Sequence, residues 1–256
     1  MATRNSISAI RRFCTSIRSH TTQLPDSDLL SSPKFSASAN STFHQYSVQD
    51  LMNARVHMGH RTKLWNPKMA PYILGHRNGM HILNLDVTAT MLRRALIAAS
   101  HMAENDCTFL WLGPRDPQKS KIVEKQARKA GAYTIDGARW IGGTLTNPIK
   151  SNQAQRFNYR IPDCVFVVDT IRHMPALREA RLCGIPTIGI VDSDCDPQFL
   201  TYPIPGNDDA ALAIYLYCSL MKHALLDGRA RGRRLSRPSV QIPSLKSAQR
   251  ARQRFR

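Results

Sequence analysis

The chain has 256 residues, of which 42% are hydrophobic, and its formal net charge at pH 7 is +18. This length allows one substantial α/β domain with tails or two small domains, and the apolar content excludes disorder over the whole chain. No stretch holds eighteen uninterrupted apolar residues, so no transmembrane helix is predicted.

Residues 1–42 are predicted to be an organelle presequence, mitochondrial in particular, followed by a linker. The first twenty residues are rich in Ser and Arg, and no acidic residue precedes Asp26. As a helix, this stretch gathers Ile7, Ile10 and Ile17 on one arc with the arginines beside it, which is typical of a targeting segment. The alternative is an ordinary unstructured terminus.

Residues 43–228 are predicted to form one α/β domain. Short apolar runs indicate buried strands, and longer amphipathic stretches between capping residues indicate helices. Strands are expected at residues 80–86, 107–113, 132–136, 164–169 and 186–192. Helices are expected at residues 47–57, 87–105, 117–132, 174–184 and 207–228, the last of them ended by Gly228. This alternation predicts a doubly wound, flavodoxin-like parallel sheet with helices on both faces.

Residues 229–256 form an Arg-rich tail with ten Lys or Arg and no acidic residue. Residues 41–228 carry a net charge of only +5, so most of the positive charge lies outside the predicted domain. Such a chain is attracted to polyanions, of which nucleic acid is the commonest, and a tail of this kind is expected to become ordered only against RNA. A basic protein without such a partner is the alternative.

Motifs for nucleotide-dependent catalysis are missing from the sequence. No GxGxxG follows a predicted strand and no GxxxxGK[ST] is present, so no cofactor and no catalytic residue are predicted. The six Cys form no CxxC pair and several lie in apolar segments. That pattern favours buried free thiols over a disulfide framework or a zinc ribbon.

Acidic residues gather at the expected carboxyl ends of the strands. The segment DSDCDP at residues 192–197 lacks the Gly and Glu of a calcium loop. Together with Asp208 and Asp209 it could hold a hard cation, but capping of turns and helix starts is the preferred interpretation. The alternative function is an α/β enzyme using Asp169, Asp192 and Asp208, with a metal.

Two basic and aromatic segments, residues 61–77 and 138–150, are the candidate nucleic-acid contacts. Lys and Arg neutralise phosphates, Gly permits close backbone approach, and an exposed Trp can stack on a base. Trp65 and Trp140 are equally well explained as core anchors, and both interpretations stay open. The predicted RNA-binding residues are Arg61, Lys63, Trp65, Asn66, Lys68, Arg77, Asn78, Arg139, Trp140, Asn147, Lys150, Arg229, Arg231, Arg233 and Arg234.

Five segments, in order, resemble signatures of the bacterial-type small-subunit ribosomal protein two family. They are ARVHMGHRTKLWNPKMAPYILGHRNGMHILNLD, RWIGGTLTN, PDCVFVVD, GIPTIGIVDSDCDP and IPGNDDAALAIYLY. The resemblance implies a doubly wound sheet and a structural protein without catalytic activity. It also implies contacts with small-subunit rRNA and neighbouring ribosomal proteins, on the solvent side of the subunit near the junction of its head and body.

One feature departs from the family pattern. Bacterial members insert a long helical hairpin between the second and third signatures, where this chain has only residues 148–161. That connection is too short for two antiparallel helices, so docking of ribosomal protein one, which the family supports in bacteria, is in doubt. The presequence-like start predicts a mitochondrial ribosomal protein; a plastid protein and a free-standing RNA-binding regulator are the alternatives.

Overall fold

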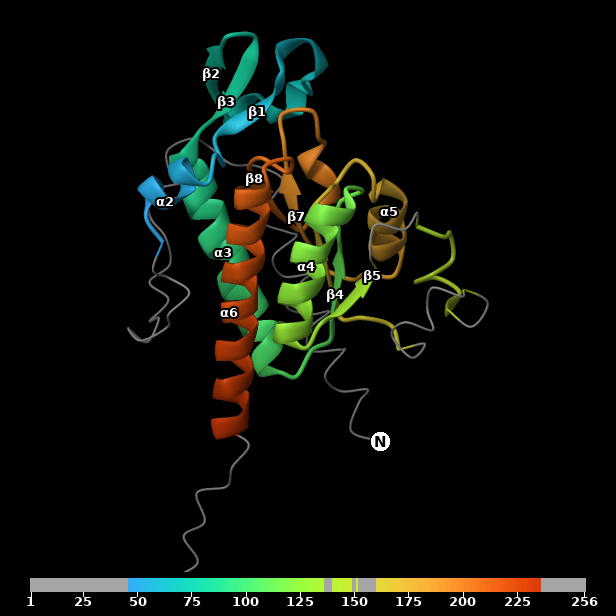
Figure 1. Ribbon diagram of the computed structural model, residues 1–256. Coiled ribbons are helices and arrows are strands. Elements are labelled where there is room, and N and C mark those ends of the chain that lie inside the picture. The colour runs from blue at the N-terminus through green and yellow to red at the C-terminus, as the bar shows by residue number, and fades with distance from the viewer. Residues whose placement is uncertain (1–45, 136–139, 149–150, 152–159, 236–256) are drawn as a thin grey trace, which may run out of the picture.

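The computed structural model describes residues 46–135, 140–148, 151 and 160–235 (Figure 1). The predicted presequence and linker, and the tail beyond residue 235, lie outside this range. Within it, no helix is long and apolar enough to cross a membrane.

A five-stranded parallel sheet forms the centre of the domain. Its strands are β4 (Phe109–Leu112), β5 (Tyr133–Ile135), β6 (Cys164–Val167), β7 (Thr187–Val191) and β8 (Tyr202–Pro205). They lie side by side in the order β5-β4-β6-β7-β8, and every neighbouring pair is parallel. Numbered within this sheet, the order is 2-1-3-4-5, which is the flavodoxin-like order. The predicted fold class is therefore confirmed.

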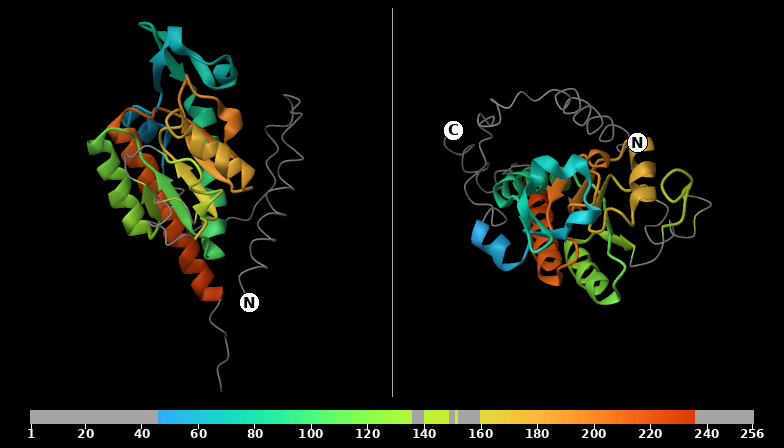
Figure 2. Two further views of the ribbon diagram at one scale, coloured as in Figure 1. Left: turned by 90° about the vertical axis from the view of Figure 1, so that its right-hand side faces the viewer. Right: turned by 90° about the horizontal axis from the view of Figure 1, so that it is seen from above.

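Helices cover both faces of the parallel sheet (Figure 2). Side chains alternate along each buried strand, so Phe109 and Trp111 pack on one face while Leu110 and Leu112 pack on the other. The first face is covered by α3 (Leu85–Glu104), α4 (Pro117–Ala130) and α6 (Ala211–Leu235), with the short helix α2 (Val48–Asn53) at its margin. The second face is covered by α5 (Met174–Leu182).

Local capping sets the start and end of several helices as the sequence predicts. Ser47 and Asp50 form a capping box at the start of α2. Asp116 accepts a hydrogen bond from the Gln118 amide at the start of α4, which ends at Gly131 with φ of 66°. Gly is favoured there because a left-handed residue closes the last turn without a Cβ penalty.

Residues 58–83 form a second, antiparallel sheet, which we call the three-stranded module. Its strands, in the order β1-β3-β2, are β1 (Met58–Arg61), β2 (Ile73–Arg77) and β3 (Met80–Leu83). The prediction that residues 80–86 form the first strand of the parallel sheet is therefore wrong. The basic segment at residues 61–77 contains strand β2. Asn78 and Gly79, with φ of 51° and 73°, turn the chain from β2 into β3 and so form a hairpin.

The C-terminal half differs from the sequence analysis in two ways. Strand β8 was not predicted, because two of its four residues are Pro; at the edge of a sheet Pro is tolerated. Helix α6 does not end at Gly228 but continues to Leu235. A Cβ on Gly228 would lie 2.2 Å from the Ser100 carbonyl oxygen of α3, so this Gly serves close helix packing and not a helix end.

Among the described residues, Cys107, Cys164, Cys195 and Cys218 are buried cysteines that form no disulfide, as the sequence predicts. Burial raises the pKa of the Cys107 thiol to about 12. Burial likewise raises the pKa of Cys195 and Cys218. These three thiols are therefore neutral at physiological pH and contribute to packing.

Candidate nucleic-acid interface

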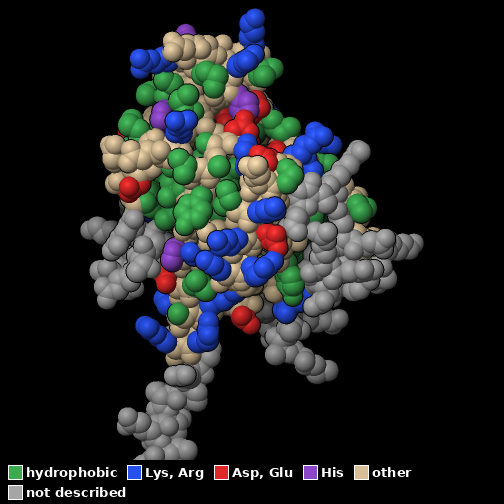
Figure 3. Space-filling view, viewed as in Figure 1, with side chains coloured by type: hydrophobic (Ala, Val, Ile, Leu, Met, Phe, Trp, Pro, Cys, Tyr) green, Lys and Arg blue, Asp and Glu red, His purple; other side chains and the backbone are tan. Residues whose placement is uncertain are grey.

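The three-stranded module presents an exposed surface that carries positive charge only. Residues 58–83 contain no Asp or Glu. Arg61 lies at the end of β1, Lys63 in the 3-10 helix η2 (Thr62–Leu64), and Arg77 at the end of β2, and all three are exposed. Lys and Arg side chains gather on the module at the top of Figure 3. This arrangement suits an extended polyanion.

The aromatic and polar residues predicted in the same segment fall into two groups. Trp65 is 41% exposed, and its ring lies 5.5 Å from that of His81, so one ring face can accept a stacked base. Asn78 is exposed at the tip of the hairpin. Asn66 and Lys68, in contrast, make contacts within the protein. Asn66 caps the 3-10 helix η3 (Pro67–Tyr72), and Lys68 Nζ lies 2.6 Å from Asp196.

The segment 140–148 is held to the protein core rather than presented to solvent. Trp140 is 6% exposed, and its Nε1 donates a hydrogen bond of 3.0 Å to Glu179. The backbone amides of Gly143 and Leu145 donate to the same carboxylate. The interpretation of Trp140 as a stacking residue is therefore wrong, and the core-anchor interpretation is correct.

The remaining predicted residues of this segment are placed differently. Asn147 is exposed next to the anchored turn. Arg139 and Lys150 lie outside the described residues, so their predicted contact with RNA stays a prediction.

The arginines at the end of α6 also fall into two groups, one that makes contacts within the protein and one that is exposed. Arg229 donates to the backbone carbonyls of Ala130 and Gly131, which end α4. Arg231 donates to Ser100 Oγ at 2.6 Å, and its Nε lies 3.4 Å from Glu104. Arg233 and Arg234 are exposed. The first two arginines tie helices together, and the last two present their charge to solvent.

A second basic surface was missed by the sequence analysis. Lys121, Lys125 and Lys129 recur every four residues on α4 and are all exposed. Burial lowers the pKa of Lys222 on α6, and the charge of Lys129 lowers it further, so the two ammonium groups lie near each other. We call Lys121, Lys125, Lys129 and Lys222 the α4–α6 patch. Lys and Arg side chains gather over α4 and α6 in Figure 3. The i, i+4 spacing was visible in the sequence, but it is equally typical of a solvated helix face.

The module is fastened to the parallel sheet through the loop that follows β7. The backbone amide of His60 donates to Ser193 Oγ at 2.9 Å, and the amide of Asn66 donates to the Ser193 carbonyl at 2.8 Å. Met69 and Leu83 add apolar contacts, because both are fully buried in the core cluster beneath α5. The basic surface is thus held by a few specific contacts at one edge of the domain.

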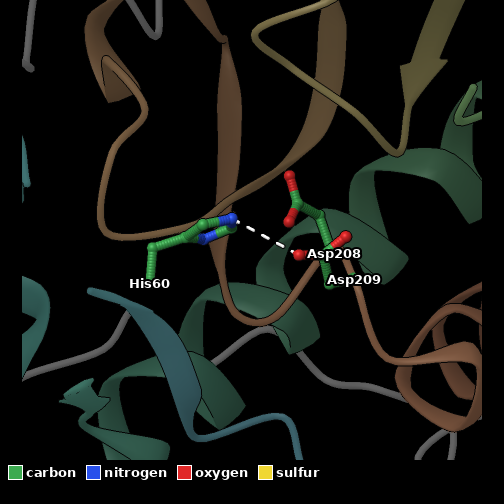
Figure 4. A group of neighbouring side chains, drawn as sticks. All are labelled: His60, Asp208 and Asp209. Carbon is green, nitrogen blue, oxygen red and sulfur yellow. Dashed lines mark ion pairs between the residues drawn. The ribbon is translucent and has the colours of Figure 1, made fainter. Parts of the chain in front are cut away.

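Beneath this basic surface lies a cluster of carboxylates, which we call the acidic edge: Asp192, Asp194, Asp208 and Asp209. They surround His60, whose Nδ1 lies 3.0 Å from Asp192 Oδ2. On the other side of the ring, His60 Nε2 lies 3.4 Å from Asp209 Oδ2 (Figure 4). The contact with Asp192 raises the pKa of His60 to about 9. Burial raises the pKa of Asp208 well above its usual range, and the charges of Asp192 and Asp169 raise it further.

The acidic edge opens into a hollow of about 720 Å³ that is also lined by Asp169, Arg115 and Lys119. The preferred prediction, that these aspartates are caps, is correct for Asp196, which caps the 3-10 helix η6 (Pro197–Phe199) and accepts from the Gln198 amide. It is wrong for Asp192, which faces His60. His60 was not predicted as part of this cluster, because nothing local connects it to residues more than 130 positions away.

Comparisons with known proteins give one consistent result. The family model described as Ribosomal protein S2 matches residues 51–159 and 149–228. The small ribosomal subunit protein uS2 of Brucella anthropi is 37% identical over 225 residues, covering 73% of this chain and 87% of the relative. The uS2 protein of Rhizobium leguminosarum is also 37% identical over 225 residues, covering 73% of this chain and 88% of the relative.

Proposed function

Because the chain belongs to the ribosomal protein S2 family, we propose that it is a structural constituent of a mitochondrial small ribosomal subunit, where it binds rRNA and neighbouring ribosomal proteins. The observation that carries the RNA contact is the three-stranded module, whose exposed charges are all positive. The family consists of ribosomal proteins and not enzymes, so the acidic edge is not an active site.

The module binds phosphates through side chains that no carboxylate of its own competes for. Arg61, Lys63 and Arg77 are exposed. Arg61 and Arg77 end the two outer strands, on either side of Met80 in β3, and Lys63 lies in η2 just after β1. Each phosphate that such a residue neutralises releases counterions, so binding weakens steeply as salt increases. Trp65 adds stacking on an unpaired base beside these charges.

The α4–α6 patch provides a second contact on another side of the domain. Lys125 and Lys129 are exposed there, and helix α6, which carries Lys222, continues from this patch to the exposed Arg233 and Arg234. The tail holds six further basic residues beyond Leu235 and no acid. The basic side chains of the patch and of the tail are both suited to the phosphates of a folded RNA.

The mitochondrial assignment is supported by the Arg- and Ser-rich start of the chain. A fusion of residues 1–45 to a fluorescent protein is expected to enter mitochondria. Import into plastids would overturn the compartment and leave the ribosomal role intact.

We also propose that this chain lacks the helical hairpin of its bacterial relatives. Only residues 148–161 join the turn at Asn147 to the strand β6, which is too few for two helices. The two stretches matched by the family model meet at residues 149–159, at the position of this connection. A partner that docks through that hairpin in bacteria is then bound differently or not at all.

The RNA contact is tested by removing three positive charges at once. The variant Arg61→Ala/Lys63→Ala/Arg77→Ala is compared with Arg160→Ala/Arg178→Ala/Arg181→Ala, whose side chains are equally exposed but lie outside the module and the α4–α6 patch. Binding of the full chain to small-subunit rRNA is measured over a range of salt concentrations. We expect the module variant to lower the slope of log affinity against log salt by about 2 to 3, and the control to leave it nearly unchanged.

Equal effects of the two triple variants would contradict the proposal, because they would show that net charge alone sets the affinity. Co-sedimentation of each variant with mitochondrial small subunits at moderate salt supplies the second measurement. A wild-type chain found only in ribosome-free fractions would overturn the ribosomal role itself.

A further inference from the structure

Helix α6 carries a row of side chains, exposed and mostly apolar, on its outer face. Leu212 is 62% exposed, Tyr215 is 52% exposed and Leu226 is 38% exposed. With the half-buried Ser219 and Lys222 they recur at alternating spacings of three and four residues, and we call these five residues the α6 stripe. We propose that the α6 stripe binds an acidic amphipathic helix of a neighbouring ribosomal protein. The inference rests on the proposed function, because it places that partner in the same small subunit.

The spacing of the α6 stripe favours a helix as its partner. An average period of 3.5 residues is that of the a and d positions of a coiled coil, whose side chains insert between those of a facing helix. At 1.5 Å per residue, residues 212–226 extend over about 21 Å of the helix axis. This length matches an average helix of a globular protein, so one partner helix can cover the whole stripe.

The apolar members of the stripe favour protein over RNA. Hydrophobic side chains gather over the upper part of α6 in Figure 3, with Lys and Arg side chains below them. A contiguous group of exposed apolar side chains marks an interaction site, and aromatic rings such as that of Tyr215 often dominate binding between proteins. Leu212 and Leu226 offer neither a charge nor a hydrogen bond to phosphates and base edges, through which RNA is bound.

The opposite side of α6 holds the stripe in place. Ile214, Tyr217, Cys218 and Met221 are buried in the core cluster that also contains residues of α3 and α4. Gly228 brings α6 close to the backbone of α3. The stripe is therefore formed before the partner arrives, and binding it requires little ordering of this chain.

The charges around the stripe favour an acidic partner. Lys222 is the charged member of the stripe, and Asp227, the one acidic residue of α6, lies outside it. Burial lowers the pKa of Lys222, and the charge of Lys129 on α4 lowers it further, so the two ammonium groups lie near each other. An Asp or Glu of the partner would be attracted by both ammonium groups. A second copy of this chain would instead bring two more positive charges to the contact.

Docking of a helix on the stripe is compatible with the RNA contact proposed for the α4–α6 patch. Lys121 and Lys125 belong to α4 and are exposed. They remain available to phosphates while Lys222 faces the partner helix. The domain then contacts protein through α6 and RNA through the neighbouring helix.

Photo-crosslinking in assembled subunits identifies what covers the stripe. Tyr215→benzoylphenylalanine places a photo-reactive ring within the stripe of the full chain. The control is Leu182→benzoylphenylalanine, at an 81% exposed position at the end of α5, which covers the other face of the sheet. Mitochondrial small subunits containing each chain are irradiated, and the linked segments are identified by mass spectrometry. We expect position 215, and not position 182, to link to a protein segment with apolar residues every three or four positions and Asp or Glu between them.

Dissociation of the chain from the subunit provides a second measurement. Leu212→Gln/Tyr215→Gln is compared with Ile171→Gln/Leu182→Gln, whose side chains are also exposed apolar residues. High salt is used because it weakens phosphate contacts and leaves apolar contacts in place. We expect the stripe variant to dissociate from the subunit at least about tenfold faster than the wild type, and the control variant to dissociate at the wild-type rate.

Several results would overturn this inference. They are a link from position 215 to rRNA, to a second copy of this chain or to a protein segment without acidic residues, the absence of any link, and equal dissociation rates of the two double variants. Leu212→benzoylphenylalanine supplies a second position for the same measurement if the Tyr215 variant does not assemble. A link to rRNA would leave the ribosomal role intact, whereas a wild-type chain absent from small subunits would refute the proposed function and this inference with it.

Discussion

The two sheets of this protein expose their residues to opposite degrees. In the parallel sheet, every residue of β4, β6 and β7 is buried. In the three-stranded module, four of the five residues of β2 are exposed. The parallel sheet therefore stabilises the fold, and the module presents its side chains to solvent while depending on the parallel sheet for support.

The largest decrease in the free energy of unfolding is expected when a core aromatic ring is removed. Phe166→Ala removes a fully buried side chain that packs edge-on against Trp111, with ring centroids 5.0 Å apart. We expect the free energy of unfolding to decrease by about 3 to 5 kcal/mol. Leu74→Ala, at a 72% exposed position of β2, should change it by less than about 0.5 kcal/mol. Urea denaturation followed by circular dichroism measures both, and similar losses would contradict the division of roles.

The second prediction contrasts two glycines. Ala is normally preferred to Gly inside a helix by about 1 kcal/mol. At Gly228, however, the added Cβ would lie 2.2 Å from the Ser100 carbonyl oxygen, so we expect Gly228→Ala to lower the free energy of unfolding by about 1 to 3 kcal/mol. Gly75→Ala, in β2 with open space around it, should be nearly neutral. A stabilised Gly228→Ala protein would show that α3 and α6 can move apart cheaply.

The same two regions show how far the sequence predicts the fold. The buried strands β4, β6 and β7 were predicted because a strand covered on both faces is apolar throughout. Caps such as Ser47 and Gly131 marked helix ends correctly, since their effect is local. Gly228 misled the prediction of the end of α6, because its role depends on a helix that is distant in sequence.

The module shows where such predictions fail. Its Pro, Gly and basic residues indicate a loop when each is taken alone. The dipeptide Asn78-Gly79 between two short apolar runs was an available hairpin signal that was overlooked. The acidic edge could not be predicted in this way, since His60 and Asp192 meet only through tertiary packing. For the same reason, the roles of Arg229 and Arg231 as links between helices could not be read from a run of arginines.

The third prediction uses a buried histidine of the parallel-sheet domain. His173 is fully buried, its Nε2 lies 2.8 Å from the Gly113 carbonyl oxygen, and burial lowers the pKa of its imidazole. The folded protein therefore disfavours protonation of His173. The stability that the neutral imidazole contributes is fully present above the unfolded pKa of about 6.5 and is lost as the pH falls below that value. The resulting change in the free energy of unfolding should be smaller than the change expected for Gly228→Ala.

A comparison with His173→Gln isolates this contribution, because other titrating groups are common to both proteins. We expect the free energy of unfolding to fall less between pH 7.5 and pH 5.5 in the variant than in the wild type. Equal decreases would mean that the imidazole is protonated in the folded state at no extra cost.

The smallest effect on stability is expected at a tryptophan of the module. Its substitution distinguishes a role in RNA binding from a role in the core. Trp65 is partly exposed beside His81, whereas Trp140 is buried against Glu179. We expect Trp65→Leu to change the free energy of unfolding by less than about 0.5 kcal/mol and yet to weaken binding to rRNA by about 1 to 3 kcal/mol, because a stacking surface is lost. Trp65→Phe, which keeps a ring, should retain most of the affinity. If Trp65→Leu instead destabilises the fold and leaves RNA affinity unchanged, Trp65 belongs with Trp140 among the core anchors, and the contact of the module with RNA rests on its charges alone.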